Sequence, residues 1–481
     1  MKLLLINTPV NQQDAYGKFS GLYNDTKMVP TGLGYLASYV RKAGVEVKLL
    51  DQYAECLPLE DVYRLIDAFA PDLIGYGATT PNYFAAINFV RAIKKGFPHI
   101  KSVMGGNHPS ILPEETLRED AVDFVIRDEG EYPLLNLCEA IANKSKEFVH
   151  IDGLSFKNSS GLFHNRRGAN VDLDTIPFPA YDLMPMQLYS SPSMTKFASP
   201  VYQMLASRGC PFSCTYCINA EMNVAARYRR RSVKLVVDEM ELLVAEFGAK
   251  QIHFWDPIFP LGRKHALEFC KEITGRGLQK RVVWSSSTRA ELLNEEIVEA
   301  MVHAGCKVLG FGLESGVPEL LRSVNKKFDL GKVREVCKIA RGKGLIVAAS
   351  FILGFPGETK EMTQQTIDFA KSLDIHYAQF SIMVPYPGTP LFKELKEQGE
   401  ILPMHENDFK RYNQSVGLTD LEPVYVPKGR DAFELKKMQR QAYKQFYLRP
   451  RMLLLHFPHI KLFKIIGLIK SLLAVLKLIR V

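Results

Sequence analysis

Three of the chain's eight cysteines lie within eight residues of one another, in the segment ASRGCPFSCTYCINA (206–220). Cys210, Cys214 and Cys217 have the spacing C-x3-C-x2-C. Three thiolates on one tight loop can ligate three irons of a 4Fe–4S cluster, which leaves the fourth iron open to a substrate or cofactor. The glycine before the first cysteine and the proline after it keep the segment out of a helix, so that the loop can wrap around a cluster.

Two other interpretations of these cysteines are open. A structural zinc ion prefers four ligands in a tetrahedron, but the nearest histidine downstream is His253, far away in sequence and inside a strand pattern. Three unrelated buried thiols are disfavoured by the close spacing. The spacing therefore favours an iron–sulfur site.

The segment CPFSCTYC resembles the cluster loop of the radical S-adenosylmethionine (SAM) superfamily. The resemblance implies that Cys210, Cys214 and Cys217 bind the cluster, and that the amino and carboxylate groups of SAM chelate the open iron. One electron from the cluster would then cleave SAM into methionine and a 5′-deoxyadenosyl radical. Tyr216 matches the position that lies beside the adenine in this family.

Strand and helix patterns alternate downstream to about residue 385, as a (β/α) barrel requires. KQIHFWDPIF (250–259) resembles the second barrel strand, where many relatives carry two acidic residues and this chain carries only Asp256. VVWSSSTRAELL (282–293) resembles the third strand, which implies that Ser287 and Arg289 hold the carboxylate of SAM.

KVLGFGLESG (307–316) resembles the fourth barrel strand, which implies that Glu314 accepts the ribose hydroxyls. Its alternative role is a cap for the following helix, since E-S-G-V-P is also typical of a helix start. FILGFPGET (351–359) resembles the fifth strand, whose glycine, here Gly354, lies against the adenine. The segment PYPGTP (385–390) is associated with family members that carry an extra N-terminal domain.

Residues 1–145 alternate short apolar strands with helical patterns, which predicts a doubly wound, flavodoxin-like parallel sheet. Such sheets bind ligands at the carboxyl ends of their strands. We expect the ligand to meet a set of small residues and one histidine there: Gly77, Thr79, Gly105, Gly106 and His108. His108 could be a ligand, but a loop histidine is more often a hydrogen-bonded structural residue.

A flavodoxin-like domain (1–145), a linker (146–195) and a radical SAM core (196–420) together resemble the cobalamin-binding subgroup of the superfamily. The segments 30–44, 105–115 and DEGEYPLLNL (128–137) carry this part of the resemblance. The cobalt-ligand motif D-x-H-x-x-G is absent, because the D-x-H at 374–376 is not followed by the glycine. If cobalamin binds, its histidine ligand does not come from that motif.

The 481 residues are 47% hydrophobic and 23% charged, which is a globular composition of two to four domains at about 150 residues each. The net charge of +9 is concentrated in the predicted C-terminal tail (421–481): residues 435–481 hold eleven Lys or Arg and no Asp or Glu. This distribution argues against nucleic acid as a partner. From residue 460 the pattern is a basic amphipathic helix, which either lies on an anionic membrane surface or packs on its own barrel.

The sequence contains no uninterrupted apolar stretch of about 18 residues and no signal peptide, so we expect a cytoplasmic protein, with the tail as a peripheral contact to the inner face of the membrane. The resemblance implies an enzyme with a 4Fe–4S cluster, SAM and cobalamin that methylates or cyclises an unactivated carbon. A small hydrophobic substrate (lipid, isoprenoid or tetrapyrrole-like) and an electron donor such as flavodoxin or ferredoxin are its expected partners. Nothing in the sequence singles out a general base. Two alternatives remain: radical SAM chemistry without cobalamin, and a non-enzymatic metal-binding module at the membrane.

Overall fold

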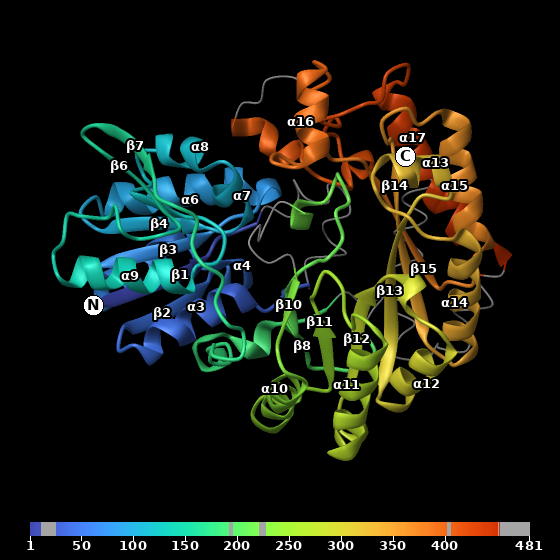
Figure 1. Cartoon of the computed structure of the whole chain (residues 1–481). Coiled ribbons are helices and arrows are strands. Elements are labelled where there is room, and N and C mark those ends of the chain that lie inside the picture. Colours follow the sequence, from blue (N-terminus) through green and yellow to red (C-terminus); the bar gives the residue numbers. More distant parts are fainter. Residues whose placement is uncertain (11–25, 192–195, 221–227, 402–405, 451, 453–481) are drawn as a thin grey trace.

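Two α/β units lie side by side in the computed structural model, and both predicted sheets are present (Figure 1). The first is a mainly parallel sheet with helices on both faces, and the second is a parallel sheet of the partial-barrel type. The predicted fold class is therefore confirmed. The structure describes residues 1–10, 26–191, 196–220, 228–401, 406–450 and 452.

The first sheet has seven strands in the order β2-β1-β3-β4-β5-β6-β7. The first five in sequence pair in parallel, and the last two join them as an antiparallel extension. The strands are β1 (Lys2–Asn7), β2 (Glu46–Asp51), β3 (Leu73–Gly77), β4 (Lys101–Gly105), β5 (Phe124–Ile126), β6 (Leu154–Asn158) and β7 (Gly161–His164). The order 2-1-3-4-5 is flavodoxin-like, and it places a ligand crevice at the carboxyl ends of β1 and β3.

The continuous apolar run of β1 reflects burial on both faces of this sheet. Leu3 and Leu5 pack in one core with α3 and α9, whereas Leu4 and Ile6 pack in another with α5 and α6. The helices of this unit are α3 (Thr31–Lys42), α4 (Gln52–Glu55), α5 (Leu59–Phe69), α6 (Tyr83–Gly96), α7 (Asn107–Ile111), α8 (Pro113–Arg118) and α9 (Glu131–Ala142).

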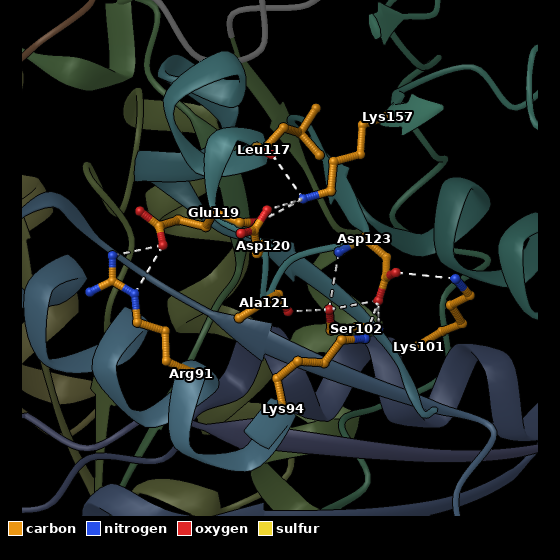
Figure 2. Close-up of polar contacts among 10 residues, drawn as sticks. All are labelled: Arg91, Lys94, Lys101, Ser102, Leu117, Glu119, Asp120, Ala121, Asp123 and Lys157. Atoms are coloured by element: carbon orange, nitrogen blue, oxygen red, sulfur yellow. Dashed lines mark hydrogen bonds and ion pairs between the residues drawn. The ribbon is translucent and has the colours of Figure 1, made fainter. Parts of the chain in front are cut away.

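The hairpin of β6 and β7 lies inside the segment 146–195, which the sequence predicted to be a linker. Figure 2 shows how it is fastened: Lys157 of β6 donates hydrogen bonds to the carbonyls of Leu117 (3.3 Å) and Glu119 (2.8 Å). Beside it, the carboxylate of Asp123 accepts hydrogen bonds from Lys94, Lys101 and Ser102. Pairing of β6 with β5 makes the hairpin part of the first sheet, and the Lys157 contacts hold it there.

The second sheet has six parallel strands in the order β15-β14-β13-β12-β11-β8. Because β15 and β8 are its outer strands, the barrel is open. The strands are β8 (Val201–Met204), β11 (Gln251–Phe254), β12 (Val283–Thr288), β13 (Cys306–Glu314), β14 (Ile346–Leu353) and β15 (Tyr377–Ile382). The helices that cover it are α10 (Val233–Glu246), α11 (Arg263–Gly275), α12 (Glu295–His303), α13 (Pro318–Ser323), α14 (Leu330–Gly342) and α15 (Lys360–Ser372).

Two segments after the barrel tie the molecule together. Helix α17 (Ala432–Tyr447) packs on β15, where Gln439 donates a 2.6 Å hydrogen bond to the carbonyl of Phe380. The segment after α16 (Pro390–Glu397) returns to the first unit, where Phe409 and Tyr412 join the core that covers one face of its sheet. Figure 1 shows α16 above the space between the two units.

The predicted amphipathic helix from residue 460 lies outside the described residues. Within the part that is described, no helix is both long and apolar enough to cross a bilayer.

Candidate functional site

The three cysteines lie on a loop at the edge of the second sheet, directly after the short strand β9 (Ser207–Gly209). Cys214 is buried, whereas Cys210 and Cys217 are half-buried, and all three are free thiols. Burial raises the pKa of the Cys210 and Cys217 thiols, and the nearby Cys214 raises both further. The charges of these thiols thus act on one another, and their joint binding of a cluster stays a prediction.

The ligand count suits a cluster better than a single zinc ion, because zinc prefers four ligands and this loop supplies three. Around one zinc ion the sulfur atoms would lie about 3.8 Å apart, at the corners of a tetrahedron. Among the described residues, no group of three His, Cys, Asp or Glu side chains is placed to hold one ion. A cubane presents separate irons to its thiolates, so three thiolates on one loop can each bind a different corner.

Tyr216 of the cysteine loop lies next to Glu314, at the carboxyl end of β13. Lys326 joins them: its ammonium is 2.8 Å from Glu314 Oε1 and 3.4 Å from the Tyr216 hydroxyl. Burial raises the pKa of Tyr216 well above its usual value, and the carboxylate of Glu314 adds to the shift. The Glu314 side chain thus faces the cysteine loop, and helix α13 has no side-chain cap. Lys326 was not predicted from the sequence.

Asp256 is buried directly behind the start of the cysteine loop. Its carboxylate accepts hydrogen bonds from the backbone N–H of Ala206 (3.1 and 3.2 Å) and from the hydroxyl of Ser207. Burial raises the pKa of this carboxyl to about 7. Asp256 therefore holds the backbone that leads into the loop.

The other predicted barrel residues lie at three places around the loop. Ser287 faces β13, where a Cβ on Gly310 would come within 2.5 Å of its hydroxyl. The guanidinium of Arg289 stacks on the ring of Phe212, at 3.9 Å from the ring centroid, inside the cysteine loop. Gly354, with φ +89°, lies under Leu435 of α17.

The predicted residues of the first unit gather at the carboxyl ends of β3 and β4. Gly77 has nothing within 4 Å of where a Cβ would be, and Thr79 and Gly106 are exposed. Gly106 has φ +97°, and a Cβ there would lie 2.6 Å from the carbonyl oxygen of Ala78. Next to it, Gly105 accepts a hydrogen bond from Ala78 N–H, which fastens the two loops together. This open glycine-rich edge suits a large ligand that approaches the backbone.

His108 lies behind that edge and is fully buried. Its ring stacks on Tyr83 at 3.8 Å and meets Phe409 edge-on at 4.6 Å. Burial lowers the pKa of His108 to about 3, so the ring is neutral. The packing favours the structural interpretation, although a role toward the ligand stays a prediction.

Ion pairs connect the two units beside the cysteine loop. Arg208, two residues before the first cysteine, is 2.6 Å from Glu131 and 3.5 Å from Glu129. Arg229, on the strand that pairs with β9, binds Glu129 as well. Both glutamates belong to the acidic stretch after β5, so the cysteine loop is joined to the end of the first sheet at which the glycine-rich edge also lies. The sequence singled out the acidic stretch but not its partners.

Two aromatic residues line the inner side of β11. Phe254 points outward, where it packs with Phe259, Phe269 and Trp284. Because side chains alternate along a strand, His253 and Trp255 point inward, and their rings lie 5.3 Å apart. His253 binds the Ser285 hydroxyl at 2.7 Å, and Trp255 is 52% exposed. Sequence reasoning considered His253 only as a zinc ligand, and it missed Trp255.

Comparisons with known proteins agree with this division of the chain. The profile of the Radical SAM superfamily matches residues 204–370, and that of the B12 binding domain matches residues 24–138. An uncharacterized methyltransferase of Pyrococcus horikoshii is 36% identical over 94% of each chain. The anaerobic magnesium-protoporphyrin IX monomethyl ester cyclase of Cereibacter sphaeroides is 28% identical over 89% of this chain and 68% of its own.

A solved structure has the same overall fold. It is the radical SAM methyltransferase TsrM of Kitasatospora setae with cobalamin and a [4Fe–4S] cluster bound. It matches 92% of this chain and 84% of its own, with a TM-score of 0.69 and 21% identity. A radical SAM domain implies a 4Fe–4S cluster and SAM, and a B12 binding domain implies cobalamin. The three predicted cofactors are thus confirmed at the level of the family.

Proposed function

Because the chain belongs to the cobalamin-binding part of the radical SAM superfamily, we propose that it methylates or cyclises an unactivated carbon of a small hydrophobic substrate. When bound, the cluster and SAM supply a 5′-deoxyadenosyl radical that abstracts hydrogen, and cobalamin supplies a methyl group. Cys210, Cys214 and Cys217 would hold the cluster. Tyr216, Glu314, Ser287 and Arg289 lie around the place where SAM would bind.

One observation carries this proposal: the ion pairs from Arg208 to Glu129 and Glu131 join the cysteine loop to the acidic stretch after β5, at the same end of the parallel strands as the glycine-rich edge. A carbon radical reacts before it can diffuse, so the radical source and the methyl donor must be held close together.

The inner side of β11 supports a hydrophobic substrate. Trp255 presents 52% of its surface at the carboxyl end of a barrel strand, where active sites of barrel enzymes lie. Exposed large aromatic side chains in such a place are typical of ligand-binding surfaces. We propose that Trp255 and His253 form one wall of the substrate site.

The test is product analysis with protein purified without oxygen and supplied with cobalamin, iron and sulfide. SAM carrying a deuterated methyl group is added with a tetrapyrrole, a hopanoid or an isoprenoid alcohol. Methylation transfers the label to the product, whereas cyclisation removes hydrogen from the substrate without labelling it. Protein that holds iron but no corrin would contradict the cobalamin part of the proposal.

The electron that reduces the cluster must come from a low-potential donor, because such clusters reach strongly negative potentials. We propose flavodoxin or ferredoxin as that partner. Formation of 5′-deoxyadenosine with either reduced protein, at a rate that saturates with its concentration, supports this assignment. Activity with dithionite and none with either protein would contradict it.

A further inference from the structure

The short segment Val324–Lys327, which follows helix α13, contacts the cysteine loop residue by residue. The carbonyl of Val324 accepts a hydrogen bond from Thr215 N–H at 3.1 Å. The Asn325 side chain donates to the carbonyl of Ser213 at 3.1 Å and is 2.7 Å from its hydroxyl. We call Val324–Lys327 the loop brace.

The last two residues of the loop brace extend these contacts. The Lys326 ammonium reaches the Tyr216 hydroxyl at 3.4 Å. The carbonyl of Lys327 accepts a 3.1 Å hydrogen bond from Arg289, whose guanidinium stacks on Phe212. The loop is thus held between its first and last cysteines at residues 212, 213, 215 and 216.

The contacts around the loop brace hold two residues in backbone conformations that they would otherwise rarely adopt. Asn325 has φ +54° and Glu314 has φ +64°, in the left-handed region that residues other than glycine rarely adopt. Asparagine tolerates this region better than most residues, but glutamate does not. Such conformations persist where the surroundings hold them, and they gather at binding sites.

Lys326 is the residue that holds Glu314 in place. It is 6% exposed, and its ammonium is 2.8 Å from Glu314 Oε1. The pair lies over Gly312, where a Cβ would be 2.7 Å from Glu314 Oε1 and 3.3 Å from Lys326 Nζ. An ammonium buried at this point fixes a carboxylate and a phenol at once, because it can donate three hydrogen bonds.

We propose that Asn325 and Lys326 are positioning residues of the SAM site: Asn325 fixes the path of the cysteine loop, and Lys326 aims Glu314 and Tyr216 at the SAM molecule. This inference rests on the proposed function, because it names the residues that position the side chains of the same SAM site. Lys326 also places a positive charge beside the cysteine loop, and this charge would act on the reduction potential of a bound cluster.

The first experiment compares Lys326→Met with Lys327→Met, in full-length protein with a reconstituted cluster. The Lys327 side chain is exposed, and the contact of this residue with Arg289 is made by its backbone carbonyl, which the substitution keeps. Lys326→Met should still assemble the cluster, but its affinity for SAM should fall at least about tenfold, the cost of losing a charge-assisted hydrogen bond. The change that SAM causes in the EPR spectrum of the reduced cluster should be lost, and the reduction potential should become more negative. Lys326→Arg should recover part of each property.

A purely structural ion pair would behave differently. The double variant Lys326→Met/Glu314→Gln removes the uncompensated buried carboxylate and should restore stability. If it also restored SAM affinity, or if Lys326→Met bound SAM as tightly as Lys327→Met, the positioning role of Lys326 would be overturned.

Asn325→Gly isolates the side-chain hydrogen bonds, because glycine keeps the left-handed backbone. In protein without a cluster, the loop cysteines of this variant should react with a thiol reagent several-fold faster than in Lys327→Met. Equal labelling rates would overturn the role of Asn325. This labelling rate is measured without a cluster, so it tests the role of Asn325 independently of the proposed function. The proposed function itself would be contradicted if the parent protein bound no cluster, or if SAM did not change the EPR spectrum of the cluster.

Discussion

The Arg208 guanidinium lies 2.6 Å from the Glu131 carboxylate, across the boundary between the two units. The side chains are 17% and 3% exposed, so the pair is shielded from water. Arg208 precedes the first cysteine by two residues, and Glu131 begins α9 of the first unit. This ion pair is the best shielded of those that connect the cysteine loop and its paired strand to the domain that would hold cobalamin.

Glu131→Gln should destabilise the protein by roughly 3 kcal/mol, because it leaves Arg208 buried with a weakened partner. The control is Asp182→Asn, which breaks the pair between Arg41 and Asp182 at the same distance of 2.6 Å. Those side chains are 43% and 59% exposed, so the cost should stay below about 1 kcal/mol. Urea unfolding of both variants measures the difference, and equal losses would show that the buried pair is not a structural connection.

Cys214→Ala should abolish cleavage of SAM to 5′-deoxyadenosine, because a cluster loop with two thiolates cannot hold three irons. Cys337→Ala is the matched control, since Cys337 is fully buried in α14, away from the loop. It should keep its iron and its activity. Undiminished cleavage by Cys214→Ala would remove the cluster assignment.

Asp256 should give the protein a measurable pH dependence. Its pKa is raised by burial from 3.8 to about 7, so the folded state holds the proton more tightly than the unfolded state. The free energy of unfolding therefore falls as the pH rises from about 4 to about 7 and levels off above that. Asp256→Asn cannot ionise, and its stability should fall less over this window.

The control for that measurement is Asp123→Asn. Burial alone would raise the pKa of Asp123, but the hydrogen bond and charge of Lys94 hold it below its usual 3.8. Its contribution is present above that pH and is lost only on further acidification. Asp123→Asn should therefore follow the parent between about pH 4 and pH 7. A parallel pH profile for Asp256→Asn and the parent would refute the raised pKa.

Trp255 can be observed separately, because the chain has only one other tryptophan, and Trp284 is fully buried. Acrylamide should quench the parent strongly and Trp255→Phe weakly. A tetrapyrrole or isoprenoid probe that occupies the barrel should protect Trp255 from acrylamide. If no probe of either class protects it, Trp255 does not line the substrate site.

Local patterns predicted most of the strands and helices, and the resemblance to a known family predicted the chemistry. The glycine and proline around Cys210 predicted a loop outside any helix, and the apolar run of β1 predicted a strand buried on both faces. The β6–β7 hairpin was missed because it is short, and only β6 is buried against the sheet.

Contacts between distant segments could not be predicted in this way. In the sequence, nothing distinguishes Lys326 from any other lysine that follows a helix, because its contact with Glu314 exists only in the folded chain. Arg208 and Glu131 are 77 residues apart in the sequence. Likewise, a Cβ on Gly354 would lie 3.0 Å from Leu435 of α17, a contact that the sequence did not indicate. Each of these contacts depends on how two distant elements pack together. The sequence of one element does not indicate which residue of the other it will meet.

Phe409 and Tyr412 complete the core of the first unit, although they come after the whole barrel in the chain. During synthesis, the first unit leaves the ribosome with Tyr83 and His108 uncovered, and it stays so until the last fifth of the polypeptide has been made. Exposed apolar surface of this kind attracts chaperones and promotes aggregation. Expression of the first unit alone would therefore require other apolar side chains in place of Phe409 and Tyr412.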